Sequence, residues 1–147
     1  MRSPFLCKAK VTQYFGARPE VYSKFGLAGH EGIDLVPELQ EWGVHALLGG
    51  TVVYDSDARE GAYGNSIRIQ DETGRVFLYA HLSENIVDLG DDVEEGDLIG
   101  IMGNSGNSQG AHLHLSMYDV NERGERLNSD NGYKGMLNPE PFLGVNK

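Results

Sequence analysis

Short stretches in which apolar and polar residues alternate recur along the chain, and many of them end at glycine or proline. The clearest is NSIRIQ at residues 65–70, where Ile67 and Ile69 would share one face of a strand and Arg68 and Gln70 the other. Similar runs predict strands at residues 11–15, 33–36, 44–48, 51–55, 75–81, 98–102 and 112–120. No stretch of about ten residues has a helical period. The pattern therefore predicts a mostly β domain, with an antiparallel sheet or open β-sandwich and few or no helices.

The segments between these runs predict turns and loops. Gly49 and Gly50 give a two-residue turn signal, so residues 44–48 and 51–55 are expected to pair as a hairpin. Residues 71–74 (DETG) predict another hairpin turn. Longer loops are predicted at residues 16–32, 82–95 and 121–138. Neither a linker nor an internal repeat interrupts the pattern, so residues 1–147 are expected to form a single domain.

Composition and charge exclude several classes of protein. The formal net charge is -10, which repels nucleic-acid phosphates, so no nucleic-acid partner is expected. Cys7 is the only cysteine, so an intrachain disulfide cannot form. The sequence has no apolar run of about 18 residues, so membrane insertion is not expected. The opening residues MRSPFLCKAK lack the apolar core of a secretory signal, so no signal peptide is expected in this chain.

Two histidines stand close together in the last predicted strand, within GAHLHLSMY at residues 110–118. Because residues two apart on a strand face the same way, His112 and His114 are expected on one face, with Leu113 and Leu115 in the core. Taken alone, the pair is as well explained by two polar residues on a solvated sheet face.

His30 and Asp34 are spaced so that an extended chain would also place them on one face. An imidazole and a carboxylate are usual ligands of Zn²⁺. His81 ends an apolar run, at the point where a strand gives way to a polar loop. Each signal is weak by itself, since such spacings arise by chance and a lone histidine at a strand end is often a surface residue. The sequence has no HExxH, so proton transfer at a metal site would fall to histidine.

Together these residues carry a family resemblance. The set His30-x-x-x-Asp34, Tyr79-Ala80-His81 and His112-Leu113-His114 resembles the M23 family of zinc metallopeptidases, the lysostaphin- and LytM-like peptidoglycan endopeptidases. Further phrases match in order: FGAR at 15–18, GHEGID at 29–34, GTVV at 50–53, YGN at 63–65, GDDVEEGDLIG at 90–100, GNSG at 103–106 and NPEPFL at 138–143. The match covers about residues 11–143 without a large insertion.

The resemblance implies a zinc-dependent endopeptidase that cuts stem peptides or cross-bridges of bacterial peptidoglycan. It implies a groove carrying one Zn²⁺ per chain, held by His30, Asp34 and His114, with His112 and His81 as catalytic groups beside the metal. It also implies action on the cell wall, in an extracellular, periplasmic or virion-associated setting, with peptidoglycan as partner. A short chain of this kind suggests a phage-encoded lysin, a tail-associated hydrolase or an excised domain. Delivery by a larger phage or secreted assembly fits the same expectation.

Other residues and readings stay open at this point. Asn65 is either a polar group near the groove floor or a turn residue, and Arg18 either binds a substrate carboxylate or forms an ion pair. The sequence does not separate the roles of His81 and His112, nor a glycine bridge from a D-amino-acid or diaminopimelate cross-link as substrate. The loop at residues 103–110 (GNSGNSQG) is a candidate groove wall, with a plain turn as the alternative.

The main alternative function is a non-catalytic M23-like scaffold that binds wall peptides or activates another hydrolase. Such a protein is expected to lack some of the five site residues, and here all five are present. The phrase VDLGDDVEEGDLIGIMG also resembles lipoyl and biotinyl carrier domains, but no lysine occurs between Lys24 and Lys134 to carry the cofactor.

Overall fold

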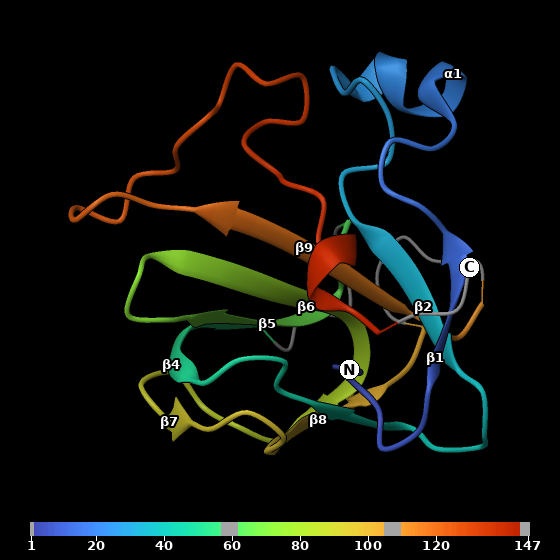
Figure 1. Cartoon of the computed structure of the whole chain (residues 1–147), viewed down its shortest axis with the longest axis vertical. Helices are drawn as coiled ribbons and strands as arrows, with labels where there is room; N and C mark the ends of the chain where they lie inside the picture. Colours follow the sequence, from blue (N-terminus) through green and yellow to red (C-terminus); the bar gives the residue numbers. More distant parts are fainter. Residues whose placement is uncertain (1, 57–61, 105–109, 145–147) are drawn as a thin grey trace.

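The computed structural model describes residues 2–56, 62–104 and 110–144, and β-strands dominate them (Figure 1). The strands are β1 (Ala9–Gln13), β2 (Ile33–Pro37), β3 (Gly43–His45), β4 (Gly50–Ser56), β5 (Asn65–Gln70), β6 (Arg75–Asn85), β7 (Asp92–Val93), β8 (Leu98–Met102) and β9 (Leu113–Asp119). The helical elements are α1 (Pro19–Tyr22) and the 3₁₀ turns η1 (Ser23–Phe25) and η2 (Glu140–Phe142). The prediction of a mostly β, antiparallel fold with few helices is therefore confirmed.

The strands form one antiparallel sheet in the order β1-β2-β9-β6-β5-β4-β7, and β8 branches from β6 to pair with β3. β6 is the longest strand, because it has β9 beside its first part and β8 beside its last. In Figure 1, α1 lies at one end of the molecule's long axis, and β7 and β8 lie at the other. The sequence-distant pair β2 and β9 meets inside the sheet, which brings residues 33–35 next to residues 113–115.

One hydrophobic core lies against this sheet, and every strand contributes to it. Ile67 and Ile69 are both buried there, as the alternation of NSIRIQ predicts. The hydroxyl of the fully buried Tyr79 accepts a hydrogen bond from the Leu47 N–H at 3.0 Å, so the one polar atom of this ring has a partner inside the core. The opposite face of β6 and β9 is covered by a smaller cluster around Val76 and Tyr118.

The predicted hairpin between residues 44–48 and 51–55 is wrong. β3 pairs with β8, whereas β4 pairs with β5 and β7. Neither Gly49 nor Gly50 has the positive φ that a two-residue hairpin turn requires. Gly50 instead lies against β5, where a Cβ would stand 2.3 Å from the carbonyl oxygen of Gln70. Gly50 is thus needed for close packing against β5, and interpreting it as part of a turn was wrong.

Two predicted loops contain regular structure. The loop at residues 16–32 holds α1 and η1, and the acidic segment 82–95 begins with the end of β6 and includes β7. β6 continues to Asn85 because β8 gives it a second partner, starting with Leu82 opposite Met102. Because β8 lies elsewhere in the sequence, the local pattern around residue 82 could not reveal this pairing. No helix in the described ranges is long and apolar enough to cross a membrane.

Candidate active site

The register between β2 and β9 assembles the centre of the site. Asp34 on β2 stands opposite His114 on β9, and Ala80 on β6 flanks His114 from the other side. Leu113 and Leu115 are fully buried in the core, so His114 points out of the opposite face of β9, as strand periodicity predicts. His30 reaches the same point from the loop that leads into β2 and is 2% exposed.

Three donor atoms converge here from three separate side chains. His114 Nδ1 lies 2.9 Å from Asp34 Oδ1 and 3.2 Å from His30 Nε2, and His30 Nε2 lies 3.3 Å from Asp34 Oδ1. Atoms of this kind at such distances need a proton or a cation among them. Ligands of a tetrahedral zinc ion at about 2.0–2.1 Å from the metal stand about 3.4 Å from one another. The donor set His30, Asp34 and His114 therefore fits a metal ion of that size.

The surroundings prepare these atoms for a cation. The main-chain carbonyl of Tyr14 lies 3.2 Å from His30 Nδ1, and because a carbonyl only accepts, Nδ1 carries the proton and Nε2 faces the site. Burial by itself raises the pKa of the Asp34 carboxyl, but contacts with the His114 and His30 rings outweigh burial and hold that pKa below its usual range. Asp34 is therefore ionised at neutral pH.

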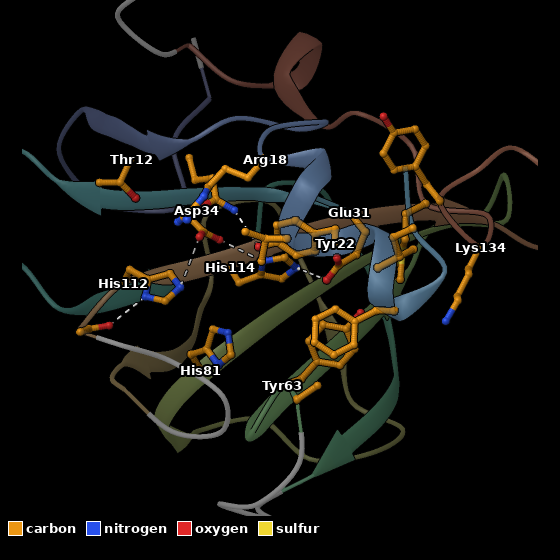
Figure 2. A pocket seen from close by; sticks show the side chains of 18 of the residues that line it. Thr12, Arg18, Tyr22, Glu31, Asp34, Tyr63, His81, His112, His114 and Lys134 are labelled. Atoms are coloured by element: carbon orange, nitrogen blue, oxygen red, sulfur yellow. Dashed lines mark hydrogen bonds and ion pairs between the residues drawn. The ribbon is translucent and has the colours of Figure 1, made fainter. Parts of the chain in front are cut away.

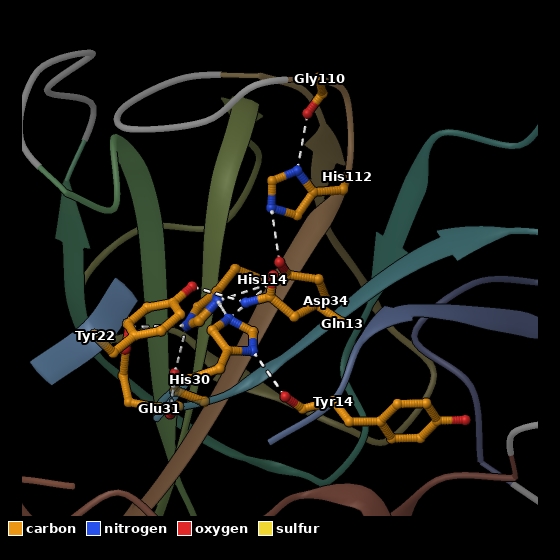
Figure 3. Close-up of polar contacts among 10 residues, drawn as sticks. Gln13, Tyr14, Tyr22, His30, Glu31, Asp34, Gly110, His112 and His114 are labelled. Atoms are coloured by element: carbon orange, nitrogen blue, oxygen red, sulfur yellow. Dashed lines mark hydrogen bonds and ion pairs between the residues drawn. The ribbon is translucent and has the colours of Figure 1, made fainter. Parts of the chain in front are cut away.

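His112 lies next to these three donor atoms, and one of its ring nitrogens is hydrogen-bonded to the main chain. Its Nδ1 donates to the carbonyl oxygen of Gly110 at 2.8 Å, which leaves Nε2 as the nitrogen that faces the site. Nε2 lies 3.7 Å from Asp34 Oδ2. Figure 3 shows this line of contacts from Gly110 through His112 to Asp34. The Gly110 contact therefore fixes the orientation of the His112 ring beside Asp34.

His81 lies where β6 changes partner from β9 to β8, and its backbone is in the left-handed region with φ 63°. Its N–H donates to the carbonyl oxygen of Tyr63 at 2.8 Å, and its own carbonyl accepts from the Gly103 N–H at 3.1 Å. Non-glycine residues in this conformation are uncommon and concentrate at functional sites. The bend brings the His81 ring to 5.0 Å from the His112 ring, between centroids.

A cavity of about 710 Å³ opens over these side chains. Figure 2 shows His81, His112, His114 and Asp34 around one space, with Tyr63 nearby. Elements distant in sequence supply the walls: β1, the α1 region, residues 62–63, residues 110–112 and the C-terminal loop with Arg126, Tyr133, Lys134 and Met136. Of the predicted site residues, five line this cavity: Arg18, Asp34, His81, His112 and His114. His30 lies behind Asp34 and His114 and is not part of the lining, and neither is Asn65.

Three further cavity residues did not stand out in the sequence: Tyr22, Glu31 and Tyr63. The Tyr63 ring packs 5.7 Å from the His114 ring, and burial raises the pKa of its hydroxyl to about 12, so the hydroxyl keeps its proton at neutral pH. Tyr22 packs 5.3 Å from His30 and accepts a hydrogen bond from Gln13 at 2.7 Å. Tyr63 and Glu31 appeared only within the matching phrases YGN and GHEGID, and nothing in the local pattern marked Tyr22.

The remaining candidates differ in placement. Arg18 lines the cavity, and its ion pair with Glu20 is long, 3.9 Å, between exposed side chains. Asn65 is buried at the start of β5, where its amide donates to the Ser83 carbonyl at 3.3 Å. This position favours a structural role over a contact with substrate. Of the loop GNSGNSQG, residues 105–109 lie outside the described residues.

Gly32 is expected to tolerate no side chain. A Cβ at this position would stand 2.5 Å from the Leu115 carbonyl oxygen and 2.7 Å from both His114 Cε1 and Ser116 Oγ. Gly32→Ala should therefore destabilise the protein by about 1–3 kcal/mol, measured by urea unfolding, and weaken metal binding. The control is Gly49→Ala, whose nearest neighbour, the Val93 carbonyl oxygen, would be 3.2 Å away. Equal stability loss in both variants would contradict the role given to Gly32.

Comparison of the sequence with known proteins identifies relatives of this chain. A sequence profile described as Peptidase family M23 matches residues 28–129. The DD-carboxypeptidase/endopeptidase Mpg of Neisseria meningitidis is 33% identical over 126 residues, covering 78% of this chain and 28% of Mpg. The peptidoglycan DD-endopeptidase ShyA of Vibrio cholerae is 37% identical over 87 residues, covering 54% of this chain and 20% of ShyA. The chain thus spans less than a third of the length of these curated relatives.

The fold comparison agrees. The catalytic domain of the antimicrobial peptidase lysostaphin from Staphylococcus simulans superposes with a TM-score of 0.70 at 27% sequence identity, covering 91% of both chains.

Proposed function

Since the chain belongs to peptidase family M23, we propose that it is a zinc-dependent endopeptidase that hydrolyses peptide bonds in the stem peptides or cross-bridges of bacterial peptidoglycan. One observation carries the proposal: His30, Asp34 and His114 place three donor atoms within 4.8 Å of one another, and His81 and His112 line the same cavity as Asp34 and His114. Three protein ligands and a remaining open position are the arrangement of catalytic zinc sites.

We assign the metal to His30 Nε2, Asp34 Oδ1 and His114 Nδ1. When bound there, Zn²⁺ supplies Lewis acidity to the substrate carbonyl and lowers the pKa of a coordinated water toward about 7. The protein's contribution is to hold the two imidazoles and the carboxylate around one point, with His30 and His114 almost fully buried.

Proton transfer falls to the other two histidines. His112 Nε2 would accept a proton from the attacking water, since Nδ1 donates to the Gly110 carbonyl. His81 faces the same space from the bend of β6 and would stabilise or protonate the developing oxyanion of the substrate. Tyr63, whose hydroxyl stays protonated, is a further hydrogen-bond donor in the cavity.

The relatives support the substrate class. ShyA is named as a peptidoglycan DD-endopeptidase and Mpg as a DD-carboxypeptidase/endopeptidase. An endolysin of Staphylococcus phage 2638A is 35% identical over 79 residues, covering 50% of this chain and 16% of the endolysin. We propose accordingly that this chain acts on the cell wall, as an extracellular, periplasmic or virion-associated enzyme. A role within a larger phage or secreted assembly is part of the same proposal.

The test is digestion of purified peptidoglycans that differ in their cross-links, with mass spectrometry of the soluble products. New amino termini would identify the cut bond and separate a glycine bridge from a D-amino-acid or diaminopimelate cross-link. Cut glycan strands with intact peptides would refute the peptidase proposal. Binding to peptidoglycan without any product would instead favour a non-catalytic scaffold, against which the complete set of five site residues argues.

Arg18 is proposed to contact a carboxylate of the substrate, because it lines the cavity and its pairing with Glu20 is weak. Arg18→Gln should raise KM by about two- to fivefold for peptides with free carboxylates, the effect of losing ~0.4–1 kcal/mol, and leave kcat nearly unchanged. The matched control is Arg123→Gln, an exposed arginine that does not line the cavity. The same change in KM for amidated peptides would rule out a carboxylate contact.

A further inference from the structure

One buried polar side chain next to the metal donors has no part in the chemistry described so far. Ser116 follows His114 by two residues on β9, so both side chains lie on the same face of the strand. Ser116 is fully buried, and its Oγ lies 2.7 Å from His114 Nε2, the ring nitrogen that points away from Asp34 and His30. The same Oγ lies 3.1 Å from the main-chain carbonyl oxygen of Glu31.

The direction of these two hydrogen bonds follows from the partners. The Glu31 carbonyl only accepts, so the Ser116 hydroxyl donates its single proton there. The lone pairs of Oγ are then left to accept, and the group that they face is His114 Nε2. Ser116 therefore favours a proton on Nε2. The Glu31 carboxylate, with Oε1 3.7 Å from Nε2, adds negative charge that favours the same placement.

Asp34 pulls the proton in the opposite direction. Its Oδ1 lies 2.9 Å from His114 Nδ1, where a protonated Nδ1 would donate a charge-assisted hydrogen bond. That tautomer blocks the nitrogen needed for metal binding. A neutral imidazole carries one proton, so the contact at Nε2 and the contact at Nδ1 compete for it.

We propose that Ser116 is a positioning residue that biases His114 toward the Nε2–H tautomer and so keeps Nδ1 available as a metal ligand. The proposal rests on the metal role given to His114 above. Hydrogen-bond partners on the far side of a ligand histidine typically change metal affinity by about 10- to 100-fold. The hydroxyl hydrogen bond to Glu31 makes the bias directional, since it removes the proton that Ser116 would otherwise offer to Nε2.

Ser116→Ala tests this in two ways. Zinc affinity, measured by competition with a chromophoric chelator, should fall about 10- to 100-fold. In the metal-free protein, the ¹⁵N shifts of His114, read under conditions where its ring carries a single proton, should move toward the Nδ1–H tautomer relative to wild type. The matched control is Ser66→Ala, a buried serine on β5 whose loss should change neither measurement.

Unchanged tautomer populations together with wild-type zinc affinity would overturn the proposal. Thermal unfolding of the metal-free variant shows whether it folds. If Ser116→Ala does not fold, Ser116→Cys carries the same test, because a thiol fills similar space but is a weak donor and acceptor. The tautomer measurement needs neither metal nor substrate, so failure of the peptidase proposal would leave its outcome readable.

Discussion

Replacing His114 with alanine is expected to abolish both metal binding and peptidoglycan hydrolysis. The substitution removes Nδ1, which lies within 3.2 Å of both other donor atoms, and leaves a two-ligand site. Zinc affinity should fall by well over ~100-fold, since even loss of a partner outside the ligand set costs about 10- to 100-fold. Equilibrium dialysis with metal analysis measures the first effect, and release of soluble peptidoglycan fragments measures the second.

The control for this variant is His45→Ala. His45 ends β3, its Nδ1 contacts the Gly96 carbonyl at 2.9 Å, and it lies outside the cavity that holds the site. Its loss should leave metal content and hydrolysis at wild-type levels. Treatment of the wild-type protein with a chelator should reproduce the His114→Ala phenotype, and added zinc should restore activity only to the chelated wild type. Wild-type hydrolysis by a metal-free His114→Ala protein would disprove the assigned centre.

The second large effect is expected for His112→Ala, in which metal binding and turnover should separate. His112 does not supply one of the three donor atoms, so zinc affinity should stay within a few-fold of wild type. Loss of a general base typically costs about 10²–10⁴-fold in rate, and kcat should fall by that factor. Steady-state kinetics on a defined cross-linked peptide, with metal content measured on the same sample, tests both parts.

His81→Ala provides the comparison that assigns the two roles. If His112 is the base, its loss should lower kcat by about 10²–10⁴-fold, whereas loss of a group that stabilises the oxyanion typically costs about 10²–10³-fold, so the larger fall is expected in His112→Ala. The reverse result would exchange the two roles. Near-normal turnover of zinc-loaded His112→Ala would remove His112 from the catalytic assignment altogether.

Local patterns predicted much of the fold because burial on one face imposes a period of two. Ile67 and Ile69 are buried as the alternation of β5 indicates, and Leu113 and Leu115 likewise anchor β9. The same patterns gave a wrong prediction at Gly50, where the glycine permits close packing and does not form a turn. Gly50 packs against the backbone of β5, and a sequence carries no sign of which of these two uses a glycine serves.

The site was predictable in part for the same reason. His112 and His114 sit at a spacing that puts them on one face of an extended segment, and their residue type suits a metal. The extended spacing expected for His30 and Asp34 is not what joins them, because His30 lies in the loop before β2. Ser116, Glu31 and Tyr22 matter through tertiary contacts with residues far away in sequence, such as the Ser116 bond to Glu31. No local period encodes those distances, and serine, glutamate and tyrosine are ordinary surface or core residues in most settings.

Because strands hold two of the proposed metal ligands and other segments form much of the cavity wall, the wall could be engineered separately. Asp34 and His114 are fixed by paired strands inside the sheet, while much of the cavity wall comes from the segment around α1 and from the C-terminal loop. Chimeras that exchange these two wall segments with those of related enzymes would alter the shape offered to a substrate and leave the strand register intact. Selectivity for the substrate could therefore be changed through the wall segments without changing the residues of the proposed metal site.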